Sequence, residues 1–257
     1  MSRASFLVFG AGAWGTALSI QLNKSGNEVF LSSFDEANLS RIASTRQNEK
    51  YLSGIKLPEE IHVSGLTENM FGKIDCVVIC VKSPYFKRAL SLLSNPSRSF
   101  KVLWATKGFD LESGALLSKI VSEHYGDDIE HGVLSGPTFA KELSLSKPTA
   151  ITLATNTIHE PSSLASKMSN QNLRVYISSD PVGVQLGGSL KNIIAIASGI
   201  SDAMKMGANA RAALITRGAE EMRVLGKNMG ANEKTFSGLS GIGDLVLSAT
   251  DDQSRNR

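Results

Sequence analysis

The sequence lacks several features that mark secreted, membrane-spanning or nucleic-acid-binding chains. Only two of its 257 residues are cysteines. Cys76 and Cys80 lie four residues apart on one predicted strand, where neighbours are poorly placed to form a disulfide. A reducing, cytoplasmic location is therefore expected. No apolar run approaches the ~20 residues that cross a bilayer, so no membrane insertion is expected. The net charge of +3 is too small to indicate a nucleic-acid partner.

The first 180 residues alternate between predicted strands and predicted helices. Apolar runs predict strands at 5–10, 28–32, 75–81, 101–105, 132–135, 150–154 and 174–178, with helices at 14–25 and 36–45 among those between them. Continuous apolar strands are typical of a parallel sheet that is covered on both faces. This alternation favours an α/β fold with a doubly wound, mostly parallel sheet.

The pattern changes near residue 180. Asp180 and Pro181 suit the N-cap and first position of a helix. Long helices are predicted at 182–204 and 209–229, and no convincing strand follows. We therefore expect two domains, 1–180 for dinucleotide binding and a smaller all-helical substrate domain over 181–257.

A glycine motif connects the first strand to the first helix. Gly10, Gly12 and Gly15 fit G-x-G-x-x-G in the first βαβ unit. Gly10 permits the tight turn, Gly12 lets a pyrophosphate approach the backbone, and Gly15 lets helix and strand pack closely. The free N–H groups and positive dipole end of the helix suit the pyrophosphate. The motif predicts a Rossmann-type site for a dinucleotide.

The second strand leaves the choice of nicotinamide cofactor open. Asp35 lies where an acidic residue could bind the ribose 2′-hydroxyl, and it equally suits the N-cap of the next helix. Ser32 and Ser33 could instead hydrogen-bond a 2′-phosphate, although no arginine follows the strand directly. NAD and NADP both remain candidates.

Three charged residues in apolar surroundings are the candidates for ketone chemistry. Lys191 lies within a very apolar predicted helix, where partial burial would lower its pKa and suit it to proton transfer. Asp244 is embedded in another apolar stretch, and Lys107 follows the fourth strand. A structural ion pair is the alternative for these residues. The polar cluster 254–257 suits a phosphate or a solvated tail.

Together these stretches resemble the bacterial NAD(P)-dependent glycerol-3-phosphate dehydrogenase family along nearly the whole chain. The matching segments are GAGAWGTAL, WATKGF, SGPTFAKEL, VGVQLGGSLKNIIAIASGISD, GANARAALITRGAEEM, TFSGLSGIGDLVLS and TDDQSRNR. The resemblance implies hydride transfer between NAD(P)H and dihydroxyacetone phosphate, which gives sn-glycerol 3-phosphate for phospholipid synthesis. With the long apolar helices it favours a homodimer. No metal is expected, because no His/Cys/Asp cluster has ligand spacing.

The resemblance also implies a role for each site residue. Lys191 would be the general acid/base, Asp244 would orient it, and Lys107 would contact cofactor and substrate. The cofactor contacts would be Gly10, Gly12, Ala13, Trp14, Gly15, Phe34, Ser83, Lys107, Ala140 and Arg255. The substrate contacts would be Lys107, Gly136, Thr138, Lys191, Asn192, Asp244, Ser254, Arg255 and Asn256.

The chain departs from the family pattern at several positions, of which the second strand and the end of the chain bear most on function. Ser32 stands where many members carry tryptophan, and Phe34 stands where a polar or basic residue is common. The family also continues through several more helices after the arginine-rich cluster, so we expect a truncated or naturally shortened chain. The alternatives are a catalytically impaired dinucleotide-binding module and a 3-hydroxyacid or ketopantoate-type dehydrogenase, against which SGPTFA and SRNR favour a phosphorylated triose.

Overall fold

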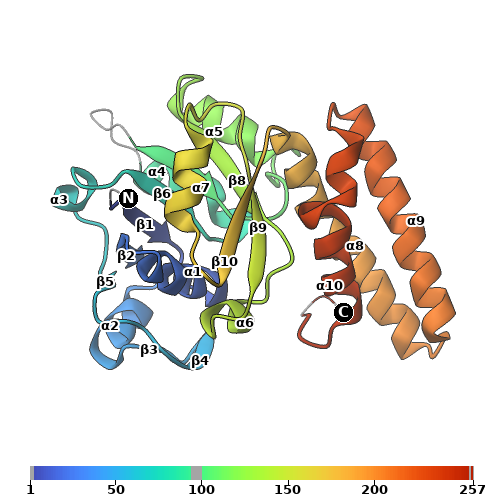
Figure 1. Ribbon diagram of the computed structural model, residues 1–257, viewed down its shortest axis with the longest axis horizontal. Helices are drawn as coiled ribbons and strands as arrows, with labels where there is room; N and C mark the ends of the chain where they lie inside the picture. Colours follow the sequence, from blue (N-terminus) through green and yellow to red (C-terminus); the bar gives the residue numbers. More distant parts are fainter. Residues whose placement is uncertain (1–2, 94–99, 255, 257) are drawn as a thin grey trace.

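An eight-stranded sheet, together with the helices on both of its faces, forms the larger part of the molecule (Figure 1). The computed structural model describes residues 3–93, 100–254 and 256. The strands follow one another across the sheet as β10 (Leu173–Ser178), β9 (Thr149–Ala154), β8 (His131–Ser135), β7 (Lys101–Trp104), β6 (Cys76–Ile79), β1 (Ser5–Phe9), β2 (Glu28–Ser32) and β5 (His62–Val63). Every neighbouring pair is parallel except β8 and β9, so the predicted mostly parallel sheet is confirmed.

The central strands are buried because both faces of the sheet are covered. All four residues of β6 are fully buried, and only Ser5 at the start of β1 is partly exposed. On one face the core contains side chains of α1 (Ala13–Lys24), α2 (Glu36–Thr45), α6 (Ala140–Ser144) and α7 (Pro161–Met168). On the other face it contains side chains of α4 (Phe86–Leu93) and α5 (Leu117–Tyr125).

Short irregular elements connect the main ones. They are the hairpin of β3 (Gln47–Asn48) and β4 (Leu52–Lys56), the helix α3 (Glu68–Phe71) and a single helical turn, η1 (Ser83–Tyr85), that leads into α4. The sequence did not predict β3, β4 or β5, because strands this short or this exposed carry no clear alternation of apolar residues.

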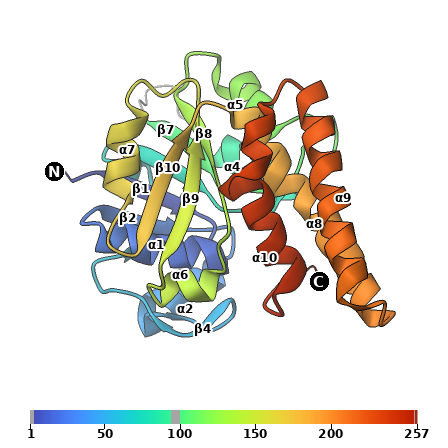
Figure 2. The same cartoon turned by 45° about the vertical axis from the view of Figure 1, so that its right-hand side comes forward.

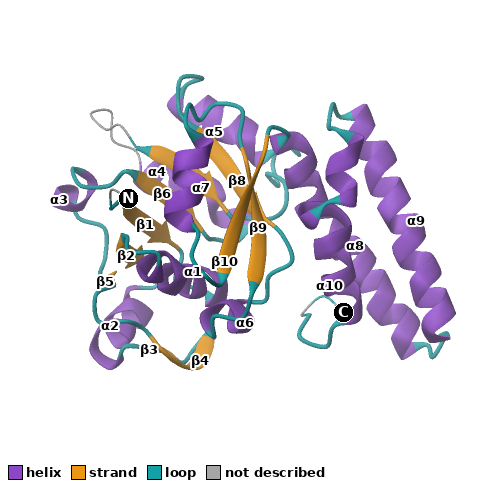
Figure 3. Cartoon of the chain, in the orientation of Figure 1, coloured by secondary structure: helices purple, strands orange, loops and turns teal. Residues whose placement is uncertain are grey.

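After β10 the chain is helical, as Figure 3 shows by colour. It forms α8 (Pro181–Ala203), α9 (Gly207–Asn228), the turns η2 (Glu233–Ser237) and η3 (Leu239–Gly243), and α10 (Asp244–Thr250). Asp180 caps α8, since its carboxylate accepts a hydrogen bond from the Gly183 N–H at 2.8 Å. No helix in the described ranges is long and apolar enough to cross a membrane.

Glycines allow the helices of this second part to pack closely. A Cβ on Gly218 of α9 would lie 2.6 Å from the Ile194 side chain of α8, and one on Gly226 would lie 2.1 Å from the Phe236 ring. Figure 2 shows α8, α9 and α10 together at one side of the sheet, and α8 contacts both of the other helices. Besides α9 and α10, α8 contacts β8 and β9, so this helix joins the helical part to the sheet.

Candidate active site

The turn between β1 and α1 has the shape that a dinucleotide pyrophosphate needs. Gly10 has φ +125°, and a Cβ there would lie 2.5 Å from the Cys80 carbonyl oxygen. A Cβ on Gly15 would lie 2.1 Å from the Gly10 carbonyl oxygen. Gly12 instead faces open space, with no atom within 4 Å of the position of a Cβ. Gly10 and Gly15 thus have no room for a side chain, whereas the backbone at Gly12, at the helix N-terminus, is accessible. This arrangement fits a bound dinucleotide.

The loop after β2 narrows the choice of groups that could bind the adenosine ribose. Asp35 caps α2, where it accepts a hydrogen bond from the Asn38 N–H at 3.0 Å, and it also pairs with Lys50 at 2.6 Å. The Lys50 ammonium and the Asn38 N–H lower the pKa of the Asp35 carboxyl. Ser32 is fully buried, so its hydroxyl cannot reach a cofactor. The N-cap interpretation of Asp35 is confirmed, and Ser33 and Phe34 remain at the surface of this loop.

Two more loops from the carboxyl edge of the sheet lie beside the glycine turn. Ser83 follows β6, and its hydroxyl lies 3.1 Å from where a Cβ on Gly108 would be. The Gly108 N–H donates a hydrogen bond to the Ser189 hydroxyl of α8 at 2.9 Å, which joins this loop to the helical part. Ala140 begins α6 and packs, half-buried, against the core on the α1 face.

A cluster of two lysines around one aspartate lies between the sheet and the helices. The Asp244 carboxylate, 1% exposed, accepts from Lys107 at 2.5 Å through one oxygen and from Lys191 through the other. Lys191 also donates to the Ser248 hydroxyl at 2.7 Å. Lys107 comes from the loop after β7, Lys191 from α8, and Asp244 from the start of α10. The structure thus brings together three residues that are as many as 137 positions apart in the sequence.

The surroundings of Lys191 lower its pKa to about 7. Burial contributes most, because it disfavours the charged ammonium. The positive charge of Lys107 acts in the same direction, while Asp244 acts against both. A lysine with a pKa near neutrality can both donate and accept a proton, which is what a general acid/base requires.

The loop after β8 lies between the glycine motif and this cluster. Thr138 accepts a hydrogen bond from the Trp14 indole N–H at 3.0 Å, so the loop is fixed to the first turn of α1. Pro137 lies 3.7 Å from where a Cβ on Gly243 would be, directly before Asp244. Gly136 is buried with φ +148°, a conformation that favours glycine.

Sequence reasoning missed Ser135 and Ser189 at this site. Ser135 is 4% exposed, and its hydroxyl has no hydrogen-bond partner in the described part of the chain. It lies 2.9 Å from where a Cβ on Gly188 would be, on the side of α8 that also contacts the Lys107 stem. Serine is too common in the chain for either position to have been recognised without the three-dimensional contacts.

The predicted phosphate-binding residues are only partly brought together. The Asn256 amide donates to the Asn192 side-chain oxygen at 2.7 Å, next to Lys191 in α8. Ser254 instead lines a small pocket with Gly199 and two carboxylates, those of Asp202 and Asp252. Arg255 lies outside the described residues.

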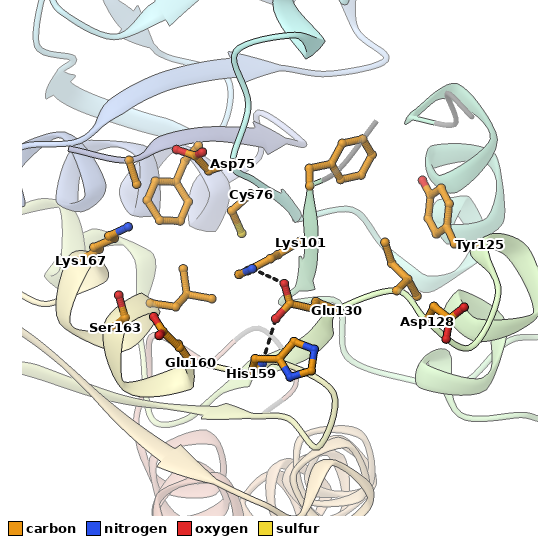
Figure 4. Close-up of a pocket in the computed structure, with 15 residues that line it drawn as sticks. Asp75, Cys76, Lys101, Tyr125, Asp128, Glu130, His159, Glu160, Ser163 and Lys167 are labelled. Atoms are coloured by element: carbon orange, nitrogen blue, oxygen red, sulfur yellow. Dashed lines mark hydrogen bonds and ion pairs between the residues drawn. The ribbon is translucent and has the colours of Figure 1, made fainter. Parts of the chain in front are cut away.

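A cavity of about 880 Å³ lies away from this cluster, at the amino ends of β1, β6 and β7. Figure 4 shows Lys101 paired with Glu130, which also accepts a hydrogen bond from the His159 N–H at 2.8 Å. Lys101 and Glu130 thus form an ion pair at the edge of the sheet opposite the glycine turn. No group of three His, Cys, Asp or Glu side chains suited to a metal occurs in residues 3–93, 100–254 and 256.

Comparison with known proteins gives one consistent family. The model of the N-terminal part of NAD-dependent glycerol-3-phosphate dehydrogenase matches residues 5–160, and that of the C-terminal part matches residues 180–257. Over 257 residues the chain is 44% identical to glycerol-3-phosphate dehydrogenase (NAD(P)+) of Legionella pneumophila, covering 100% of this chain and 78% of that protein. The enzyme of the same name from Haemophilus influenzae is 43% identical over 258 residues, which are 100% of this chain and 77% of that protein.

Solved structures agree with the sequence relatives. The glycerol-3-phosphate dehydrogenase of Coxiella burnetii superposes with a TM-score of 0.93 at 37% identity, covering 99% of this chain and 78% of that one. The ketopantoate reductase of Ralstonia eutropha, at a TM-score of 0.62 and 17% identity over 89% of this chain and 76% of that one, shares the fold alone. The chain belongs to the NAD(P)-dependent glycerol-3-phosphate dehydrogenase family.

Proposed function

We propose that the chain interconverts dihydroxyacetone phosphate and sn-glycerol 3-phosphate, with NADH or NADPH as the reductant. The observation that carries this proposal is the cluster of Lys107, Lys191 and Asp244, which faces the carboxyl edge of the sheet where the glycine turn would hold the dinucleotide. When bound, the nicotinamide supplies the hydride that reaches C2 of the ketone. We propose residues 1–180 as the dinucleotide domain and 181–257 as the substrate domain.

Lys191 is proposed as the residue that moves the proton. Its ammonium donates a proton to the substrate oxygen on C2 during reduction, and its neutral amine takes that proton back during oxidation. A pKa of about 7 lets both forms be populated near neutral pH. Asp244 and Ser248 hold the nitrogen in place through its other hydrogen-bonding positions.

The net charge of the cluster suits an anionic substrate. With both lysines protonated, two positive charges share one carboxylate, so the site keeps an excess positive charge. That charge stabilises the oxygen on C2 as negative charge develops there. It also attracts the phosphate of a triose phosphate, which a simple ketone lacks.

The remaining substrate contacts are proposed from the family resemblance together with position. Gly136 and Thr138 border the cluster through the loop that Trp14 fixes. Asn192 with Asn256, and Ser254 with Arg255, are proposed to bind the phosphate. Binding energy from this remote group would orient the reacting carbon.

We further propose a cytoplasmic homodimer. Both cysteines are free thiols, which suits a reducing compartment. One side of α8 exposes apolar side chains at helical spacing, namely Ile193, Ile196, Ile200 and Met204. Sedimentation analysis tests the dimer directly, and a purely monomeric protein at micromolar concentration would contradict it.

The experiment that tests the function measures loss of reduced-nicotinamide absorbance when the chain is mixed with dihydroxyacetone phosphate. Dihydroxyacetone, the same ketone without the phosphate, is the matched control substrate. We expect turnover of the phosphorylated ketone that Lys191→Ala abolishes. A wild-type protein that binds cofactor but turns over neither ketone would instead indicate a catalytically impaired dinucleotide-binding module.

A further inference from the structure

The loop after β2 has little free negative charge with which to bind a ribose hydroxyl. Both carboxylate oxygens of Asp35 are occupied, one by the Asn38 N–H and the other by Lys50. The other carboxylate of this loop is that of Glu36, which is exposed in the first turn of α2. A dinucleotide site of this type selects NAD by a carboxylate at the end of the second strand, and a nearby arginine accommodates the 2′-phosphate of NADP.

A cation from another element lies over this loop. The Arg88 guanidinium of α4 is 4.7 Å from the centroid of the Phe34 ring. The Phe34 ring in turn packs edge-on against Phe9, at the end of β1, with centroids 4.9 Å apart. Tyr85, which is exposed, lies 6.2 Å from Phe34 on the same side. The guanidinium is therefore positioned by a ring that is itself anchored next to the glycine turn.

Arg88 and its neighbour Lys87 differ in their ion-pair partners. Lys87 pairs with Asp110 at 2.9 Å and with Glu112 at 2.8 Å. Arg88 is exposed and has no carboxylate partner among the residues that the structure describes. A guanidinium held over an aromatic ring can still donate two parallel hydrogen bonds to a phosphate.

We infer that Arg88, held over Phe34, binds the adenosine 2′-phosphate and makes this chain selective for NADPH over NADH. This inference rests on the proposed function, because it assigns the adenosine end of the same cofactor. The positive charge at this loop comes from α4, through the Arg88 guanidinium over the Phe34 ring. Pairing of Asp35 with Lys50 removes one charge that would repel a dianionic phosphate.

Calorimetric titration with 2′,5′-ADP and with ADP tests the assignment without turnover. The two probes differ in carrying or lacking the 2′-phosphate. We expect the wild type to bind 2′,5′-ADP more tightly. Arg88→Gln should weaken that binding by about tenfold to a hundredfold, the usual range for a hydrogen bond to a charged group, and leave ADP binding unchanged. Lys87→Gln removes the same charge from the same helix and should change neither titration.

Two outcomes would overturn the inference. One is equal wild-type affinity for both probes, and the other is an Arg88→Gln variant that weakens both equally. A parallel assay with NADPH, NADH and dihydroxyacetone phosphate keeps the two proposals separate. Turnover without 2′-phosphate discrimination contradicts the role of Arg88 alone, whereas discrimination without turnover contradicts the proposed function alone.

Discussion

Replacing Asp244 with asparagine isolates the electrostatic part of the mechanism. The substitution preserves the shape of the side chain but removes the one negative charge that Lys107 and Lys191 share. Breaking a buried ion pair destabilises a protein by ~3–5 kcal/mol. We expect the lower end of that range, because Lys107 is 28% exposed and can hydrate, while Lys191 can release its proton.

The effect on the reaction follows from the protonation of Lys191. With a pKa of about 7, this residue is half protonated at pH 7. An opposite charge at contact distance shifts a pKa by about one to three units, so loss of Asp244 should lower the pKa of Lys191 further. A drop of about two units would leave roughly one molecule in a hundred protonated, and reduction at pH 7 would slow about fiftyfold.

The assay is kcat for reduction of dihydroxyacetone phosphate from pH 5 to pH 9. For Asp244→Asn, kcat should recover as the pH falls toward 5, because the neutral lysine regains its proton. Asp202→Asn is the control, since it removes a carboxylate from α8, the helix that carries Lys191, and Asp202 pairs with Arg211. A variant whose pH profile matched that of the wild type, or whose rate fell equally at every pH, would refute the reasoning.

Three further predictions concern the fold and the cofactor turn. Gly15→Ala should destabilise the chain, because its Cβ would lie 2.1 Å from the Gly10 carbonyl oxygen, whereas Gly12→Ala should melt normally and lose only affinity for NADPH in a fluorescence titration. Asp180→Ala should cost about 2 kcal/mol or more in a denaturant titration, since that carboxylate accepts from two N–H groups and a threonine hydroxyl. The lowered folded-state pKa of Lys191 means that the unfolded chain binds more protons between about pH 7 and pH 10. The free energy of unfolding of the wild type, compared with that of Lys191→Met, should therefore rise with pH across that window. A difference between the two proteins that did not change with pH would count against the burial of this charge.

The sheet and the cofactor turn could be predicted from the sequence because their signals are local. The glycines and the apolar runs around them each depend on near neighbours, and strand boundaries such as those of β2 agree with the prediction. The hairpin of β3 and β4 was not predicted, because two-residue and exposed strands follow no apolar pattern.

The sequence predicted the residues of the site better than it predicted their contacts. Lys191 and Asp244 were recognisable as charges in apolar stretches, but their contact with each other and with Lys107 depends on packing between α8, α10 and the sheet. Arg88 carried no sequence signal at all, because its position over Phe34 joins two separate βα units. From the sequence alone, Asp35 suited either a ribose contact or the N-cap of α2. Its contacts with Asn38 and Lys50 in the structure favour the N-cap.

The most direct test of the account compares wild type with Lys191→Met, a substitution that keeps an apolar side chain of similar length, with sulfur in place of Cδ, and removes the proton-carrying nitrogen. NADPH oxidation with dihydroxyacetone phosphate is followed together with NADPH binding. The account predicts a wild type that forms sn-glycerol 3-phosphate and a variant that binds NADPH normally yet forms none. A variant that turned over at the wild-type rate would contradict the assignment of Lys191 as the proton donor.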